Sequence, residues 1–172
     1  MSRPEASEAV PYYSRYIDRV PTDDIVGFLR AQLDENLPFL RAITEEQSLH
    51  RYEPGKWSIR EVLGHVTDTE RVFAFRAFWF ARAFDADLPG FDQDVGARNS
   101  GAHERSWSAL LAELSAARAS TVSVFEGLAD GAWRRQGIAS GNRFTVRAIA
   151  YIIGGHLSHH VALLKERYLT AR

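Results

Sequence analysis

The sequence has no cysteine among its 172 residues, and this absence removes three kinds of chemistry. Without cysteine there can be no disulfide framework, no thiolate metal ligand and no cysteine nucleophile. Long apolar runs are missing too, since no stretch of roughly 18 apolar residues could span a membrane. The first ten residues, MSRPEASEAV, carry charges where a signal peptide has an apolar segment. We therefore expect a soluble, cytoplasmic protein with no membrane partner.

A surplus of positive charge is also missing. Lys and Arg number 21 against 22 Asp and Glu, so the formal net charge is -1. Proteins that bind nucleic acids broadly usually gather Lys and Arg on one face, and the sequence therefore predicts no nucleic-acid partner. The length suits one domain with a sizeable core, covering residues 1–172. Within it, residues 1–20 are expected to form a short N-terminal lead-in, of which the first ten residues are expected to be poorly ordered.

Apolar residues recur at helical spacing in four stretches, whereas no stretch alternates with the period of two that is typical of strands. The second stretch has the clearest start: Ser58 and Glu61 form a capping box, and Trp57 and Val62 stand at the positions of a hydrophobic staple. Its inward-facing stripe is expected to end at Phe84. The sequence thus predicts an all-α four-helix bundle, with helices over about residues 22–43, 58–84, 106–128 and 145–169.

The connection between the second and third helices, about residues 85–105, is long and contains Pro89 and Gly90. A tight turn joins antiparallel neighbours, but a connection of this length can travel the height of the bundle. We therefore expect a long crossover between helices 2 and 3, which makes these helices parallel and gives an up-down-down-up arrangement.

Three aromatic side chains of the second helix fall outside its inward stripe. At roughly 100° per residue, Phe75, Phe78 and Trp79 project away from the core. Exposed aromatic patches are rarely left in contact with water. Two interpretations follow: either the crossover covers these residues, or they form a homodimer interface.

Two histidines of the fourth helix share one face, because His156 and His160 are four residues apart. That face is the centre of the apolar stripe, where burial disfavours charge on either ring. A shared divalent cation would use an acceptor nitrogen from each ring, and this spacing is a common way to hold zinc or nickel. Gly154 and Gly155 precede the pair and leave room for a ligand or a facing helix.

His65, on the second helix, is the natural third ligand. It lies beside the inward stripe, on the flank that also carries Thr69 and Arg76. A single histidine on a helix more often packs or faces solvent than binds metal, so the prediction depends on all three together. Three histidines with an open position are typical of a catalytic site, whereas a structural site supplies four ligands.

Other polar residues leave alternatives open. His159 could replace His160 as a ligand, contact a ligand without binding the metal, or face solvent. A fourth ligand could come from His159, Asp92 or Asp94. Three nearby charged residues have two interpretations: Glu61, Asp68 and Arg76. They orient a ligand or bind an anionic substrate, or they simply form a solvated helix surface. We therefore assign no catalytic residue beyond the metal set.

Three motifs together resemble the DinB/YfiT-like superfamily of bacterial four-helix-bundle proteins. They are YEPGKWSIREVLGH with the following DTER (52–65 and 68–71), LPGFD (88–92) and HLSHH (156–160). The resemblance implies an up-down-down-up bundle, often dimeric, with one divalent metal ion held by one histidine of the second helix and two of the fourth. Those positions match His65, His156 and His160.

The resemblance also implies a range of activities. Characterised relatives include transferases and isomerases that use low-molecular-weight thiols such as bacillithiol or mycothiol, and others are labelled metal-dependent hydrolases. We therefore expect a metal-dependent enzyme that acts on a small-molecule substrate through a metal-activated thiol or water. The alternative from another class is a non-catalytic interaction protein that the metal stabilises.

Overall fold

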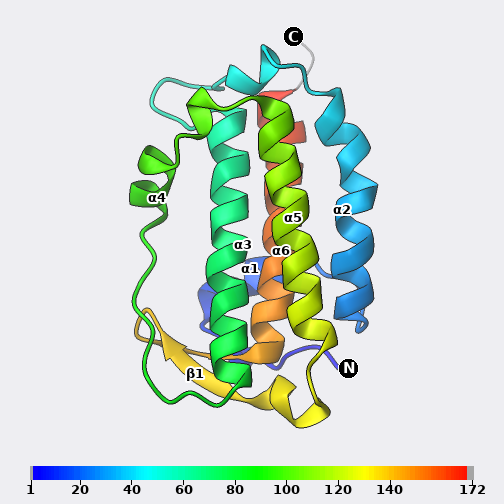
Figure 1. The fold of residues 1–172 in the computed structure, drawn as a ribbon, viewed down its shortest axis with the longest axis vertical. Helices are drawn as coiled ribbons and strands as arrows, with labels where there is room; N and C mark the ends of the chain where they lie inside the picture. The colour runs from blue at the N-terminus through cyan, green and yellow to red at the C-terminus, as the bar shows by residue number, and fades with distance from the viewer. Residues whose placement is uncertain (1, 170–172) are drawn as a thin grey trace.

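Four long helices packed side by side make up most of the computed structural model, which describes residues 2–169 (Figure 1). They are α2 (Ile25–Ala42), α3 (Ile59–Ala81), α5 (Trp107–Glu126) and α6 (Val146–Leu163). In Figure 1, α2 and α6 run upward and α3 and α5 run downward. The predicted all-α bundle and its up-down-down-up order are therefore confirmed. None of these described helices has the length and hydropathy of a membrane-spanning segment.

The starts of the helices follow local capping chemistry. At α3 the predicted capping box is confirmed: the Ser58 hydroxyl accepts from the Glu61 amide at 3.3 Å, and the Glu61 carboxylate accepts from the Ser58 amide at 2.7 Å. Helix α2 begins later than predicted, because Asp24 is its N-cap and accepts from the Gly27 amide at 3.0 Å. A carboxylate in this position satisfies one of the free N–H groups of the first turn.

One helix end differs from the prediction, and another changes its helix type before it reaches the predicted end. Helix α3 stops at Ala81, and Ala83 then takes a positive φ of 59°, which a continuing helix does not allow. Phe84, predicted to face inward, is consequently 47% exposed. Helix α6 ends at Leu163 and continues as one π-helical turn, Leu164–Tyr168.

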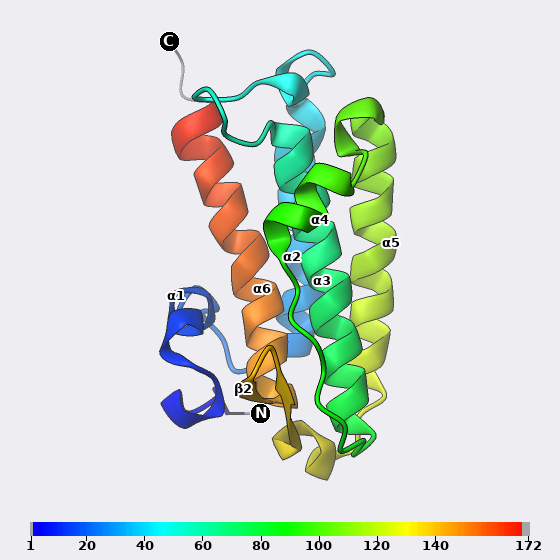
Figure 2. The same cartoon turned by 90° about the vertical axis from the view of Figure 1, so that its left-hand side faces the viewer.

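The long crossover between α3 and α5 contains structure that the sequence did not predict. Helix α4 (Gln93–Asn99) and a 3₁₀ turn (Ala102–Glu104) both pack against α3. Figure 2 shows the crossover running along α3 to the top of α5. Elements this short hold too few residues for an apolar period to be visible, which explains why the prediction missed them.

Strands were not expected from the sequence, yet a hairpin of β1 (Gln136–Ala139) and β2 (Asn142–Thr145) precedes α6. Ser140 and Gly141 form its two-residue turn with φ of 54° and 70°, the positive values that a type I′ turn requires. The crossover pairs with this hairpin, because the Leu88 amide donates to the Ile138 carbonyl at 2.9 Å and the Leu88 carbonyl accepts from the Ser140 amide at 3.1 Å.

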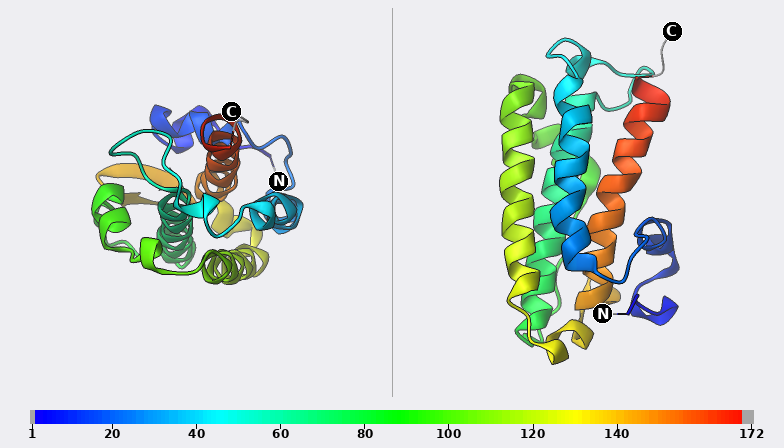
Figure 3. Two further views of the ribbon diagram at one scale, coloured as in Figure 1. Left: turned by 90° about the horizontal axis from the view of Figure 1, so that it is seen from above. Right: turned by 90° about the vertical axis from the view of Figure 1, so that its right-hand side faces the viewer.

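The N-terminal lead-in packs against the bundle over its described part, residues 2–20. Helix α1 (Ser14–Ile17) packs against α6 (Figure 3). Tyr16 and Val20 of this segment are buried. A Cβ atom at Gly155 would lie 1.8 Å from the Tyr16 carbonyl oxygen. The space that Gly155 leaves therefore admits the N-terminal segment, and a ligand does not occupy it.

The core consists of two apolar clusters, one toward each end of the bundle. One cluster includes Leu29 and Ile152, and the other includes Leu33 and Leu157. Between these levels lie buried polar side chains from all four long helices: Gln32, Glu70, Arg118 and His156. The middle of the bundle is thus a polar layer enclosed by two apolar ones.

Candidate metal centre

The three predicted histidines meet in this polar layer. The Nε2 atom of His156 lies 3.1 Å from Nε2 of His65 and 3.1 Å from Nε2 of His160. All three side chains are buried, and one nitrogen from each lies within 4.8 Å of the others. No Cys, Asp or Glu in the described residues belongs to this group.

Helix geometry explains the convergence. His156 and His160 stand one turn apart on α6, so their rings project from the same face. Helices α3 and α6 pack closely along their length, and His65 on α3 faces the pair. The rings of Trp57 and Tyr16 pack against the histidines, with centroids 4.8 Å from His65 and 5.2 Å from His156.

Burial keeps these imidazoles neutral. Desolvation lowers the pKa of His65 to about 4, although the Asp94 charge opposes the shift. Burial also holds the pKa values of His156 and His160 well below their usual range, and the neighbouring imidazoles lower both further. At neutral pH all three rings are therefore unprotonated on one nitrogen, which is the form that binds a metal ion.

The donor set fits a divalent metal ion. Metal–nitrogen bonds of about 2.1 Å, meeting at tetrahedral or octahedral angles, separate the nitrogens by roughly 3 Å. Coordination through Nε2 places the remaining ring proton on Nδ1. For His65, Nδ1 then lies 3.3 Å from the Thr69 hydroxyl, a position from which the hydroxyl can orient the ring. Nδ1 of His160 is buried without a partner among the described residues.

The alternative ligands do not join the group. His159 is partly exposed, and its ring lies edge-on to Tyr16 at 5.4 Å. The Asp92 carboxylate caps α4, where it accepts from the amides of Asp94 and Val95. These two bonds lower the pKa of Asp92. The Asp94 carboxylate is close enough to act on the charge of His65 but is not part of the group.

The charged residues near His65 divide into two sorts. Glu61 belongs to the capping box and pairs with Arg51, and Asp68 pairs with Arg71 at 3.5 Å. Both carboxylates therefore form ion pairs on the helix surface, in agreement with the interpretation of these residues as a solvated surface. Arg76 is different, because it is buried and lines a cavity next to the histidines.

That cavity has a volume of about 90 Å³ and reaches His65 and His156. The sequence predicted none of the walls that come from outside α3 and α6. They are the N-terminal tyrosines, the crossover and the tip of the hairpin: Tyr12, Tyr13, Tyr16, Phe91, Gln93 and Ser140. The serine–glycine pair at 140–141 was the one available signal, since such a dipeptide marks a turn.

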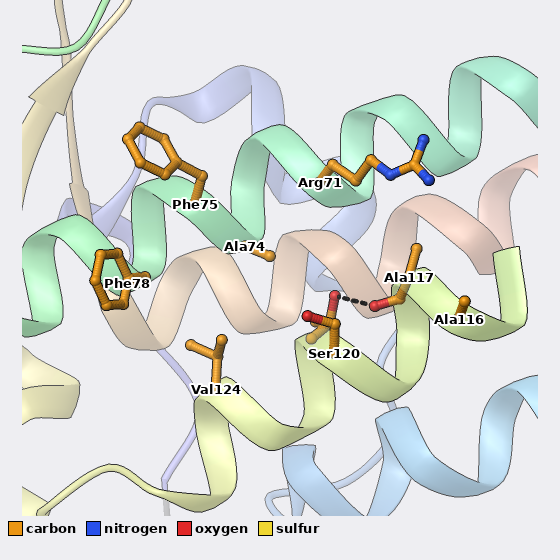
Figure 4. A pocket seen from close by; sticks show the side chains of 9 residues that line it. Arg71, Ala74, Phe75, Phe78, Ala116, Ala117, Ser120 and Val124 are labelled. Atoms are coloured by element: carbon orange, nitrogen blue, oxygen red, sulfur yellow. Dashed lines mark hydrogen bonds between the residues drawn. The ribbon is translucent and has the colours of Figure 1, made fainter. Parts of the chain in front are cut away.

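A separate groove lies between α3 and α5, away from the histidines (Figure 4). Phe75 and Phe78 line it and are 50% and 38% exposed, with small residues of α5 opposite them. Trp79 lies outside this groove, because its ring stacks on Phe84 and its indole N–H donates to the Ala86 carbonyl at 3.1 Å. The crossover therefore covers Trp79 and leaves the two phenylalanines uncovered.

An up-down-down-up bundle with three buried histidines gathered from α3 and α6 defines a class of helical proteins with a potential metal centre. The comparison with family models gives this class a name. The DinB superfamily model matches residues 29–164, and the chain belongs to that superfamily. No curated protein matches the chain significantly.

Two solved structures share the fold. YfiT from Bacillus subtilis, described as a probable metal-dependent hydrolase with an unusual four-helix bundle topology, has a TM-score of 0.70 and 17% identity. The match covers 96% of this chain and 90% of YfiT. The mycothiol-dependent maleylpyruvate isomerase has a TM-score of 0.67 and 10% identity, over 85% of this chain and 61% of the isomerase. At these identities, both structures bear on the fold alone.

Proposed function

We propose that this chain is a metal-dependent enzyme that acts on a small-molecule substrate, with one divalent ion held by His65, His156 and His160. The observation that carries the proposal is the convergence of three buried histidines: Nε2 of His156 lies 3.1 Å from Nε2 of both His65 and His160. Packing of the core alone does not require three imidazoles at this position. No fourth ligand of the cysteine, histidine or carboxylate type stands with them among residues 2–169. An open position of this kind favours catalysis over a closed structural site.

When bound, a divalent ion supplies Lewis acidity that lowers the pKa of a coordinated water or thiol. The chain's residues set the conditions for this chemistry. Three neutral imidazoles leave the charge of the ion undiminished, and the rings of Trp57 and Tyr16 pack against His65 and His156. The Thr69 hydroxyl orients His65. Imidazole nitrogens suit zinc and nickel among other ions, and these two are the ions that we propose.

The leading reaction class is transfer of a low-molecular-weight thiol, and the second is hydrolysis. The mycothiol-dependent isomerase, whose fold is similar, motivates the use of a thiol, and the probable hydrolase YfiT motivates hydrolysis. Because the chain has no cysteine, any thiol must come from a cosubstrate. The cytoplasmic location and the homodimer remain predictions from the sequence.

The first experiment is measurement of metal content by inductively coupled plasma mass spectrometry on protein purified without a histidine tag. Wild type should carry close to one equivalent of zinc, nickel or a similar ion, and His65→Ala and His156→Ala should lose it. His103→Ala, at an exposed position, is the matched control and should keep the metal. Metal-free wild type that folds and takes up no added ion would overturn the proposal.

Turnover then separates the reaction classes. Activity that requires an added thiol supports transfer, and activity in water alone supports hydrolysis. Loss of stability in His65→Ala, with no turnover found in the metal-loaded wild type, would instead support the non-catalytic interpretation.

A further inference from the structure

Arg76 differs from the other buried arginines of the described chain in having no acidic partner. Burial of an unpaired cation is costly, so the other buried arginines each form an ion pair with a glutamate. The pairs are Arg60 with Glu45, Arg118 with Glu70, and Arg147 with Glu8. Among residues 2–169 no carboxylate pairs with Arg76, which is only 4% exposed.

The hydrogen bonds of Arg76 hold its side chain but leave its charge unbalanced. Its Nη2 donates to the Pro89 carbonyl at 3.1 Å and to the Ser140 hydroxyl at 3.0 Å, and both acceptors are neutral. Neither Nε nor Nη1 has a hydrogen-bond partner within the described residues. Neither atom is fully buried, so both remain accessible. Arg76 lines the cavity that reaches His65, and it also lines a groove between α3 and the crossover.

The position of Arg76 on α3 relates this cation to the histidines. Arg76 follows His65 by eleven residues, about three turns, so both side chains lie on one flank of the helix. Their Cα atoms are thus about 16 Å apart along the axis. Helical side chains lean toward the N-terminus, so the long arginine side chain reaches back toward His65. Thr69 and Phe73 lie between them on the cavity wall.

The lining of the cavity adds no negative charge, since neither Asp nor Glu contributes to it within the described residues. Two neutral imidazoles, those of His65 and His156, and one arginine leave the cavity lining positive, and a bound divalent ion would make it more so. A small organic anion would balance this charge, and a carboxylate is the group that an arginine of limited accessibility binds well.

We propose that Arg76 is the anion-binding residue of this site and receives a carboxylate of the substrate, while the reacting end of the same molecule lies at the histidines. The proposal rests on the proposed function for the reacting end. It defines the substrate class as small organic acids whose carboxylate is several bonds away from the reacting group.

The test compares an acid with its neutral counterpart by isothermal titration calorimetry. Glutarate and glutaramide have the same carbon chain, but only glutarate carries carboxylates. Wild type should bind glutarate at least about tenfold more tightly than glutaramide, because charge-assisted hydrogen bonds are the stronger ones. Arg76→Met should remove this preference, and Arg76→Lys should keep part of it. Equal binding of the two probes by wild type would overturn the proposal, whether or not Arg76→Met folds.

Ser140→Ala is the control for a purely structural role, because it removes one hydrogen bond from Arg76 and keeps the cation. It should keep the preference for glutarate. A loss as large as that of Arg76→Met, accompanied by the same drop in melting temperature, would make Arg76 a link between crossover and hairpin and overturn anion binding. A preference for glutarate that survives in Arg76→Met would also overturn anion binding by Arg76.

Each titration is repeated on chelator-treated wild type, and metal content is measured on every sample. The preference should persist after chelation, because Arg76 keeps its charge without the ion. Wild type that is metal-free as purified, takes up no added ion and still prefers glutarate would refute the metal site and leave the role of Arg76 in place. Metal-loaded wild type without the preference would refute the role of Arg76 and leave the metal site in place.

Discussion

Arg118 of α5 and Glu70 of α3 form a doubly hydrogen-bonded ion pair inside the bundle, with Nε–Oε1 and Nη2–Oε2 distances of 2.7 and 2.9 Å. Arg118 also donates to the Gln32 side-chain carbonyl of α2 at 2.9 Å. The Gln32 amide group in turn donates to the Gly154 carbonyl and the Ser158 hydroxyl of α6. One chain of hydrogen bonds therefore joins all four long helices beside the histidine layer.

Neutralising this pair should be far more costly than neutralising a surface pair. We expect Glu70→Gln to lower the free energy of unfolding by about 3–5 kcal/mol, because it leaves the Arg118 charge buried without its partner. Glu126→Gln, which breaks the exposed pair with Arg30, should cost less than about 1 kcal/mol. Urea denaturation of both variants measures the difference, and similar costs would contradict it.

A side chain at Gly155 should detach the N-terminal segment from α6. Gly155→Ala places a Cβ atom 1.8 Å from the Tyr16 carbonyl oxygen, so either α1 or α6 must move. We expect a loss of about 1–3 kcal/mol in stability and faster hydrogen exchange over residues 6–20. Gly131→Ala, where an added Cβ meets no atom within 4 Å, is the matched control. Unchanged exchange in Gly155→Ala would show that the contact does not hold this segment.

The metal-free protein should become less stable as the pH falls below about 6.5. Burial lowers the pKa of His65 to about 4 in the folded chain, whereas an unfolded histidine takes up a proton near pH 6.5. Between these values the unfolded state binds more protons, so stability falls with falling pH by up to about 1.4 kcal/mol per unit for each such histidine. The lowered pKa values of His156 and His160 act in the same direction.

Urea midpoints of chelator-treated protein at pH 7.5 and 5.5 measure this dependence. His65→Ala should reduce its slope because one proton-uptake site is removed. His103→Ala, at an exposed position, should leave the slope unchanged. Equal slopes in wild type and His65→Ala would show that proton uptake by His65 does not contribute to the loss of stability.

The predicted homodimer should depend on the groove between α3 and α5. Changing Phe75 and Phe78 together to serine removes the two exposed aromatic side chains of that groove. We expect light scattering after size exclusion to give twice the chain mass for wild type and the single mass for the double variant. Leu49→Ser, at another exposed apolar residue, should remain a dimer. A monomeric wild type, or a double variant that stays dimeric, would contradict this interface.

The parts of the fold that the sequence predicted well depend on local rules that distant contacts do not alter. Ser58 and Glu61 mark the start of α3 through bonds within four residues, and the i,i+4 spacing places His156 and His160 on one face wherever α6 lies. The length of the crossover was enough to predict parallel α3 and α5. The meeting of His65 with the other two needed only the packing of α3 on α6.

The remaining features depend on contacts between distant segments. Tyr16 becomes part of the cavity only because Gly155, far along the chain, admits its backbone. The strands β1 and β2 have four residues each, too few for alternation to be visible, and Leu88 of the crossover completes their pairing. The unpaired charge of Arg76 could not be inferred from sequence either, since it depends on which carboxylates lie elsewhere.

The candidate metal-binding histidines and much of the cavity wall come from separate parts of the molecule. The three histidines and Arg76 stand on long bundle helices, whereas the N-terminal tyrosines, the crossover and the hairpin turn supply much of the remaining cavity wall. Exchange of these peripheral segments between related bundles would therefore change which molecules the cavity accepts, while the three histidines stay in place. A scaffold divided in this way can diversify its substrates without rebuilding its chemistry.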